Sequence, residues 1–313
     1  MVKILIAGVI LDLILGDPYS FPHPVKWMGH MIMREEILIR KFAHTKKDLQ
    51  LGGFIMVLIN LVLGFGIPFA FDYFLKGMGK TFFSIYGIYV CISGKMLHVE
   101  ACKVKKALGN SLEAGRKQLS NIVGRDTREL TESEIIKATV ETVAENTSDG
   151  IIAPLFYILI FGIPGGFMYK FVNTMDSMVG YTNDKYIDLG RFPAIVDDIF
   201  NYIPARITAL LMIVAGFFYG KGYHAYKIVK RDHKNHLSPN AGYPEGAIAG
   251  ILGVQLGGGH HYFGKYIDKP RIGDYNRKIE IRDISKTVKV MYITEGLFVI
   301  LMTIFIHVKY TLF

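Results

Sequence analysis

Acidic side chains recur at four-residue spacing in the segment ETVAENTSDG, where Glu141, Glu145 and Asp149 would share one face of a helix. Like charges on one face repel, so the stripe fits a divalent cation or charged ligand better than a solvated surface, which stays the alternative. Magnesium prefers one or two carboxylates together with water and phosphate oxygens. The predicted catalytic residues are Glu141, Glu145, Asp149 and Asp176, of which Glu145, Asp149 and Asp176 are the predicted magnesium ligands.

Amides and cations accompany these carboxylates in two further motifs, NTMDSMVGYTNDKY and RFPAIVDDIFNYIPAR. Asn173 lies three residues before Asp176, and helical spacing would place the two on one face. The cations nearby suit a phosphate or carboxylate ligand, although Arg206 alone could be a membrane-edge residue whose charge reaches water. The predicted ligand-binding residues in this region are Asn146, Ser148, Asn173, Lys185, Arg191, Asp197, Asp198, Asn201 and Arg206.

The segment 236–262, HLSPNAGYPEGAIAGILGVQLGGGHHY, combines a proline-containing loop with a glycine-rich run. Small residues let the backbone approach a ligand closely. Asn240, in the loop, and Glu245, which can begin a short glycine-rich helix, also belong to the predicted ligand-binding residues. A P-loop is excluded, because the chain has no GxxxxGK followed by Ser or Thr.

Three prolines lie close together near the N-terminus, at Pro18, Pro22 and Pro24. Proline fixes the backbone, so these residues predict a rigid loop that holds His23 in place at a ligand. The alternative is a tight connector with Trp27 as an anchor at the membrane interface.

Long apolar stretches predict membrane-spanning helices. Residues 151–169 carry no charge and residues 53–75 carry only Asp72, while about 20 helical residues cross a ~30 Å hydrocarbon core. Weaker stretches are 82–94, 207–220, 246–259 and 290–306, the last with Glu295 as a candidate buried carboxylate. The whole chain has 51 % hydrophobic residues and a mean hydropathy of +0.30. Together with the apolar stretches, these values predict an all-α, polytopic integral membrane protein rather than a soluble helical one. We expect about 4–6 membrane helices, some of them broken or re-entrant.

The path of these helices leaves two alternatives. Residues 53–75 and 82–97 predict an antiparallel helical hairpin. If 151–169 and 207–220 both cross the membrane fully, residues 171–200 lie on the outer face, where there is no ATP. Alternatively, one or both enter as broken or re-entrant segments packed within protein, which Pro154, Pro164 and the Gly165-Gly166 pair permit.

Cations lie between the apolar stretches, and the formal net charge is +9. Basic loops beside membrane helices indicate the cytoplasmic side, and no nucleic-acid recognition motif accompanies them. We therefore predict a lipid bilayer, and no nucleic acid, as a partner. Residues 99–137 predict a cytoplasmic helical insertion, in which Thr131 and Glu134 form a capping box. The insertion and the candidate segments 141–206 and 236–262 belong to one predicted domain, 1–313.

The motifs LDLILGDPYSFPHPVKWMG, ETVAENTSDGIIAPLFY, NTMDSMVGYTNDKY, FPAIVDDIFNYIPAR and SPNAGYPEGAIAGILGVQLGG resemble those of the CobD/CbiB family in order and approximate spacing. These are integral-membrane proteins of cobalamin (vitamin B12) biosynthesis. The resemblance covers about residues 5–262. It departs from the family pattern at Lys26, where arginine is as common, and at Gly246, where alanine is usual.

The resemblance implies an adenosylcobinamide-phosphate synthase, an ATP-dependent amide ligase. Such an enzyme joins (R)-1-amino-2-propanol O-phosphate, or aminopropanol or ethanolamine phosphate, to the propionate carboxylate of adenosylcobyric acid. ATP, Mg²⁺ and an adenosylated corrinoid are then the expected cofactors and substrate. The expected location is the cell (cytoplasmic) membrane, with the active site on the cytoplasmic side, and a homo-oligomer or other late-pathway membrane enzymes as further partners.

In that chemistry the acidic stripe and Asp176 would bind magnesium or deprotonate the amine. Lys185, Arg191 and Arg206 would bind phosphate, while Asp197, Asp198 and Asn240 would orient the corrinoid or the nucleotide. The rival class is a non-enzymatic membrane transporter or an AmpE-like sensor, since transporters also build sites from broken helices.

Overall fold

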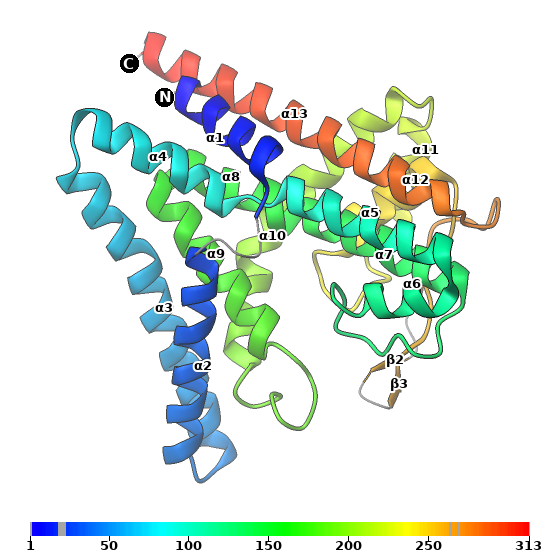
Figure 1. The fold of residues 1–313 in the computed structure, drawn as a ribbon, viewed down its shortest axis with the longest axis horizontal. Helices are drawn as coiled ribbons and strands as arrows, with labels where there is room; N and C mark the ends of the chain where they lie inside the picture. Colours follow the sequence, from blue (N-terminus) through cyan, green and yellow to red (C-terminus); the bar gives the residue numbers. More distant parts are fainter. Residues whose placement is uncertain (1, 18–22, 263–264, 268–269, 313) are drawn as a thin grey trace. The chain divides into compact units, whose positions relative to one another are not determined.

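The structure is a computed structural model that describes residues 2–17, 23–262, 265–267 and 270–312. Within these residues the elements are helices, apart from two short two-stranded sheets (Figure 1). Pro18 and Pro22 of the predicted rigid loop lie outside the described residues. The chain forms two compact units. The first comprises Met1–Ser93, Ala153–Asn201 and Met302–Phe313, and the second comprises Gly94–Ile152 and Tyr202–Leu301.

Four stretches of the described residues are helical, long and apolar enough to cross a membrane. They are Lys46–Phe74, Gly77–Asn110, Arg191–Phe217 and Ile281–Lys309. The predicted all-α polytopic membrane fold is therefore confirmed. Glu295, in the last of these stretches, is buried as predicted. The sidedness of the membrane helices and the single-domain prediction stay predictions.

The described residues of the first unit form α1 (Val2–Leu15), α2 (Pro24–Phe42), α3 (Lys46–Phe74), α4 (Gly77–Cys91), α8 (Ala153–Phe161), α9 (Ile163–Val179), the start of α10 (Arg191–Phe217) and the end of α13 (Ile281–Leu312). Helices α3 and α9 pack against each other, and α2 contacts both. Their shared core includes Ile32 of α2, Met56 of α3 and Met175 of α9, all of them inaccessible or nearly so. Helices α3 and α4 are joined by a two-residue turn and contact each other, and α4 ends at Cys91 rather than at residue 97. The antiparallel arrangement of the predicted hairpin stays a prediction.

The apolar stretch 151–169 is not a single crossing helix. It begins in the π-helical turn η1 (Ser148–Ile152), continues as α8 and restarts as α9. Gly162 separates the two helices at a φ of 70°, a left-handed conformation that glycine adopts without steric cost. Helix α9 then packs back against α8 so closely that a Cβ at Gly165 would overlap the Tyr157 carbonyl oxygen. The broken-helix alternative is the one that the structure shows.

The second unit contains α5 (Gly94–Asn110), α6 (Leu112–Leu119), α7 (Glu132–Thr147), η1, the end of α10, α11 (Gly222–Asp232), α12 (Gly242–Leu252) and most of α13 (Ile281–Leu312). Helices α5, α6 and α7 pack together, and α7 also contacts α12. The predicted capping box is present, because Thr131 and Glu134 each bond the other's backbone N–H at the start of α7. Residues 99–137 are therefore largely helical, as predicted.

Four short strands lie between α12 and α13. Strand β1 (Leu256–Gly257) pairs antiparallel with β4 (Arg271–Ile272), and β2 (His260–Tyr262) pairs antiparallel with β3 (Lys265–Ile267). In the first pair Leu256 faces Ile272. This pairing returns the chain to α11 and α12, which β4 contacts.

Charged side chains fix the loop that follows β4. The Asp232 carboxylate accepts hydrogen bonds from the Gly273 N–H at 2.8 Å and from Arg231 Nε at 2.6 Å. Arg231 Nη2 also lies 2.8 Å from the Asp274 carboxylate. Burial alone would raise the pKa of Asp232, but the bonds from Arg231 and Gly273 outweigh it and lower that pKa. Hydrogen bonding to Arg231 likewise lowers the pKa of Asp274.

These lowered pKa values predict a pH-dependent stability. A carboxyl group with a lowered folded-state pKa adds stability above its ordinary pKa of about 3.9, and that stability is lost as pH falls through the folded-state value. Asp232→Asn should therefore lower the melting temperature at neutral pH and reduce its fall below about pH 4. Thermal unfolding in detergent, followed by circular dichroism, checks this. Glu129→Gln, an exposed carboxylate in the same unit, is the control. An unchanged pH profile in Asp232→Asn would contradict the assignment.

Candidate functional site

Glu141 holds the glycine-rich turn after α12. Its Oε1 accepts the Gly257 N–H at 2.8 Å, and its Oε2 accepts a bond from Arg125 Nη2 at 2.7 Å. Lys137, one helical turn earlier, donates to the Gly257 carbonyl at 3.2 Å. Gly257 has a φ of 72°, and a Cβ there would lie 2.6 Å from the Pro270 carbonyl oxygen, so glycine is required. The Glu141 carboxylate is thus engaged in positioning a turn, a contact that its sequence spacing does not reveal.

The acidic stripe follows α-helical geometry only as far as Glu145. Helix α7 ends at Thr147, and Asp149 lies in the π-helical turn η1, where the wider winding changes the direction of later side chains. Glu145 is half-buried, and its carboxylate makes no hydrogen bond or ion pair with a described residue. Glu141 and Glu145 share a face, but Asp149 does not simply extend it.

Two neutral residues beside the stripe differ in their contacts. Asn146 donates to the Thr142 carbonyl of its own helix at 2.9 Å. The Ser148 hydroxyl is buried, with no hydrogen-bond partner among the residues that the structure describes. Single π turns often occur at functional sites, and this one brings a buried, unbonded hydroxyl within a few residues of Glu145.

Magnesium would need ligands beyond these side chains. No group of three or more His, Cys, Asp or Glu residues within the described ranges is placed to hold a metal ion. Glu145 and Asp149 supply carboxylate oxygens in the second unit, whereas Asp176 belongs to the first. One or two carboxylates with phosphate oxygens and water remain a suitable magnesium set. The magnesium site stays a prediction.

A buried polar network links α9 to α10 in the first unit. The Tyr169 hydroxyl donates to Asn201 Oδ1 at 2.8 Å, and Asn201 Nδ2 donates to Asp197 Oδ2 at 2.9 Å. Asn173 Nδ2 lies 3.5 Å from the other Asp197 oxygen. The structure thus joins Asn173, Asp197 and Asn201, three of the predicted ligand-binding residues. Tyr169 was not predicted, because a tyrosine in an apolar run does not reveal its hydroxyl partner.

The other predicted residues of the first unit have separate surroundings. Asp176 is half-buried in the last turn of α9, and its carboxylate lies so near Gly180 that a Cβ there would overlap it. Lys185 is exposed, donates to the Tyr186 hydroxyl at 2.7 Å and lies 3.4 Å from Glu36. The bond to Tyr186 raises the pKa of Lys185.

Three further predicted residues lie at helix starts or on helix faces. Arg191 is exposed at the first position of α10, and Asp198 is half-buried one residue after Asp197. His23 caps α2: its Nδ1 accepts the Val25 N–H at 3.3 Å, and its Nε2 lies 3.2 Å from the Asp17 carboxylate. These contacts give His23 a structural role in starting the helix.

Arg206 lies between two aromatic rings in the second unit. Its guanidinium carbon is 3.4 Å from the centre of the Tyr202 ring and 4.3 Å from that of the Tyr243 ring. Its Nη1 donates to Asn240 Oδ1 at 3.2 Å. Two residues predicted from separate motifs, Arg206 and Asn240, are therefore in contact. The rings hold the guanidinium in a fixed orientation, as recognition of a phosphate or carboxylate requires.

The loop that carries Asn240 also places Glu245. His236 Nδ1 accepts the Ser238 N–H at 3.0 Å, and its Nε2 lies 3.6 Å from the buried Glu245 carboxylate. The Ser238 hydroxyl in turn accepts the Asn240 N–H at 3.2 Å. The predicted residues Arg206, Asn240 and Glu245 thus form one cluster, which we call the arginine cluster together with Tyr202, His236 and Tyr243. The last three were not predicted.

Comparison with known proteins gives consistent matches. Residues 5–291 match the family model described as CobD/Cbib protein. The chain is 48 % identical over 301 residues to the cobalamin biosynthesis protein CobD of Clostridium tetani, covering 95 % of each chain. It is 49 % identical over 293 residues to the CobD protein of Clostridium perfringens, covering 92 % of each. It is 42 % identical over 293 residues to the cobalamin biosynthesis protein CbiB of Salmonella typhi, again covering 92 % of each. No solved structure matches.

The α9–α10 network predicts a stability effect. Asn201→Ala removes the hydrogen bonds that Asn201 makes to the Tyr169 hydroxyl and to one Asp197 oxygen, and a hydrogen bond contributes about 0.5–1.5 kcal/mol, or about 1.5–3 kcal/mol to a charged group. We expect a lower free energy of unfolding in detergent, measured by chemical denaturation. Ser177→Ala, which removes an exposed hydroxyl from α9, is the matched control. Equal stability of the two variants would contradict the network.

Proposed function

This chain belongs to the CobD/CbiB family, and on that premise we propose that it is an ATP-dependent amide ligase of cobalamin biosynthesis. The family match and the names of the relatives support a role in cobalamin synthesis. The proposed reaction joins (R)-1-amino-2-propanol O-phosphate, or a related amino-alcohol phosphate, to the propionate carboxylate of adenosylcobyric acid. The product is adenosylcobinamide phosphate, and ATP becomes ADP and phosphate.

A carboxylate does not condense with an amine in water, so the proposed chemistry first activates the carboxylate. A carboxylate oxygen attacks the γ-phosphorus of ATP, the bond to the ADP oxygen breaks, and an acyl phosphate forms. The amine nitrogen then attacks the acyl carbon and loses a proton, and phosphate leaves with the former carboxylate oxygen. Both steps need fixed cationic donors at the phosphate oxygens and a base near the amine.

The observation that carries this proposal is the arginine cluster. Both hydrogen bonds that Arg206 makes to described residues use Nη1, one to Asn240 and one to the Tyr202 carbonyl. Nε and Nη2 remain as donors for a phosphate or carboxylate oxygen. Stacking on two rings limits rotation of the guanidinium, so little side-chain entropy is lost when an anion binds.

Glu145 is the proposed base or magnesium ligand. Its carboxylate is half-buried, makes no bond to a described residue and lies beside the π turn that holds Asp149. Magnesium bound by these two carboxylates would offset charge on the phosphate oxygens of ATP. Glu141 is a positioning residue, because its two oxygens already bind Arg125 and Gly257.

The proposed location is the cell membrane, with the site facing the cytoplasm, where ATP is present. A homo-oligomer or a complex with other membrane enzymes of the pathway is also proposed.

The amine substrate is either aminopropanol phosphate or ethanolamine phosphate, because the one methyl group that separates them changes affinity by only about 1–3 kcal/mol. The broken helices α8 and α9 also suit the alternative, a non-enzymatic transporter or an AmpE-like sensor.

Turnover by the purified protein tests the proposal. Detergent-solubilised protein is given ATP, magnesium, adenosylcobyric acid and aminopropanol phosphate, and the corrinoid is analysed by mass spectrometry. We expect a mass gain equal to one amide-linked aminopropanol phosphate, formed only with ATP. Corrinoid binding without turnover by either amino-alcohol phosphate would instead support the transporter or sensor alternative.

The same assay tests the arginine cluster. Arg206→Lys keeps the charge but loses the planar stacking and the fixed donors, and a charge-assisted hydrogen bond is worth about 1.5–3 kcal/mol. We therefore expect kcat/KM to fall about tenfold to a hundredfold. Arg282→Lys, an exposed arginine on α13, should leave it unchanged. Equal activity of the two variants would remove the arginine cluster from the site.

A further inference from the structure

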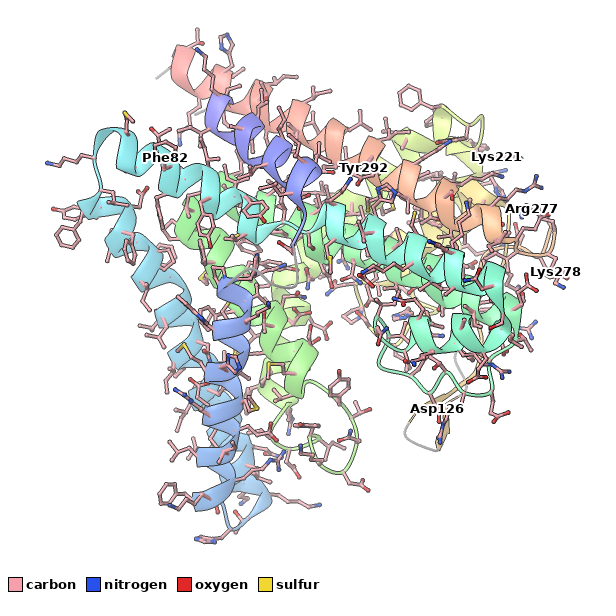
Figure 2. The ribbon with its side chains drawn as sticks, in the orientation of Figure 1. Phe82, Asp126, Lys221, Arg277, Lys278 and Tyr292 are labelled. Atoms are coloured by element: carbon pink, nitrogen blue, oxygen red, sulfur yellow. The ribbon has the colours of Figure 1, made fainter. Side chains whose placement is uncertain are left out.

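A pocket of about 430 Å³ lies in the second unit, apart from the arginine cluster. Its walls come from the turn between α10 and α11, the start of α11, the end of α12, the loop before α13 and the first turns of α13. The cationic residues lining it are Lys221, Arg277 and Lys286, accompanied by His224 and Asn276. Figure 2 shows Lys221 and Arg277 at the same end of this unit. No carboxylate among the described residues lines the pocket.

A buried carboxylate behind the wall fixes the central cation. Asp283 is fully buried and accepts bonds from both terminal nitrogens of Arg277, each at 2.7 Å. Lys286 Nζ lies 3.7 Å from the same carboxylate. Asp283 therefore contributes one negative charge, whereas Arg277 and Lys286 contribute two positive charges and Lys221 contributes a third. The pocket keeps a net positive charge, while Arg277 is held in place before any ligand arrives.

Arg277 also bonds the end of α12, whose last residues line the pocket. A helix C-terminus carries partial negative charge, which would repel an anion. Arg277 Nη2 donates to the Leu252 carbonyl at 2.9 Å and satisfies one of the carbonyl groups at this helix end.

His224 is fixed in the same wall. Its Nδ1 lies 2.8 Å from the Gly250 carbonyl and its Nε2 lies 3.2 Å from the Asp274 carboxylate. Both partners are hydrogen-bond acceptors, so the ring is held between them in one orientation.

The surroundings of the pocket indicate the depth of membrane headgroups. The apolar stretch Arg191–Phe217 ends beside it, and the stretch Ile281–Lys309 begins beside it. Exposed aromatic residues follow the first of these, with Phe218 at 72 % and Tyr223 at 64 % exposure. Exposed aromatic residues at the ends of membrane helices are typical of the membrane–water interface.

We propose that this pocket binds the phosphate group of an anionic membrane lipid. Cationic pockets between membrane helices, at the level of the interface, recognise such headgroups. A soluble phosphate such as ATP carries the same chemical group. The position at the ends of two membrane stretches favours the lipid. This proposal does not depend on the ligase reaction.

Lipid retention in native mass spectrometry tests the proposal. The probe is phosphatidylglycerol, compared with zwitterionic phosphatidylcholine, on the full chain in detergent. Lys221→Gln combined with Lys286→Gln removes two cations without leaving Asp283 unpaired, as a change at Arg277 would. We expect the double variant to bind phosphatidylglycerol about tenfold more weakly, since each lysine near the headgroups contributes several-fold. Phosphatidylcholine retention should not change.

A matched double variant, Lys278→Gln with Lys289→Gln, removes two exposed lysines that do not line the pocket (Figure 2 labels Lys278). It should bind phosphatidylglycerol like the unchanged protein. An equal loss in both double variants would mean a general charge effect and overturn the site. A parallel titration with ATP and with inorganic phosphate separates the sources. If the Lys221/Lys286 double variant loses ATP binding but retains the lipid unchanged, the lipid assignment is overturned. If this variant binds the lipid, ATP and inorganic phosphate as well as the unchanged protein does, the pocket is not an anion site.

Discussion

The cost of burying polar groups in apolar surroundings governs this structure. Its helices are apolar enough to cross a membrane, and within a bilayer each polar group must find its partner inside the protein. Much of this requirement is met by polar networks. Tyr169, Asn201 and Asp197 bond one another between α9 and α10, and Glu141 satisfies both the Gly257 N–H and Arg125. Such networks fix side chains in place, and a fixed polar side chain can act on a ligand.

The clusters differ in how far their donors and acceptors are already used. Glu141 is fully engaged, so it positions the glycine-rich turn rather than a substrate. Arg206 is held by two rings and one amide but keeps donors directed to no described residue. Arg277 is intermediate: Asp283 fixes it, yet it faces an open cationic pocket. The number of donors and acceptors already bonded thus distinguishes side chains in structural ion pairs from side chains that can bind an anion.

Short-range features of the fold could be predicted from the sequence, whereas long-range contacts could not. The Thr131–Glu134 capping box and the contact between Asp197 and Asn201 follow from helical spacing. The end of α-helical geometry after Thr147 was not predicted, because π turns have no simple sequence signal. Gly257 bonds Glu141 across 116 residues, and the Tyr243 ring covers Arg206 from another segment. Spacing within one helix carries no information on such partners. The family resemblance was stated from motifs, and the comparisons confirm it.

The central claim is that the protein activates a carboxylate by transferring phosphate to it, and oxygen labelling tests that claim most directly. Adenosylcobyric acid carrying ¹⁸O in its free propionate carboxylate is converted with ATP and aminopropanol phosphate, and the released phosphate is examined by mass spectrometry. The account predicts that one labelled oxygen leaves with inorganic phosphate, because the acyl phosphate breaks at the acyl carbon. Product formation with unlabelled phosphate would contradict it.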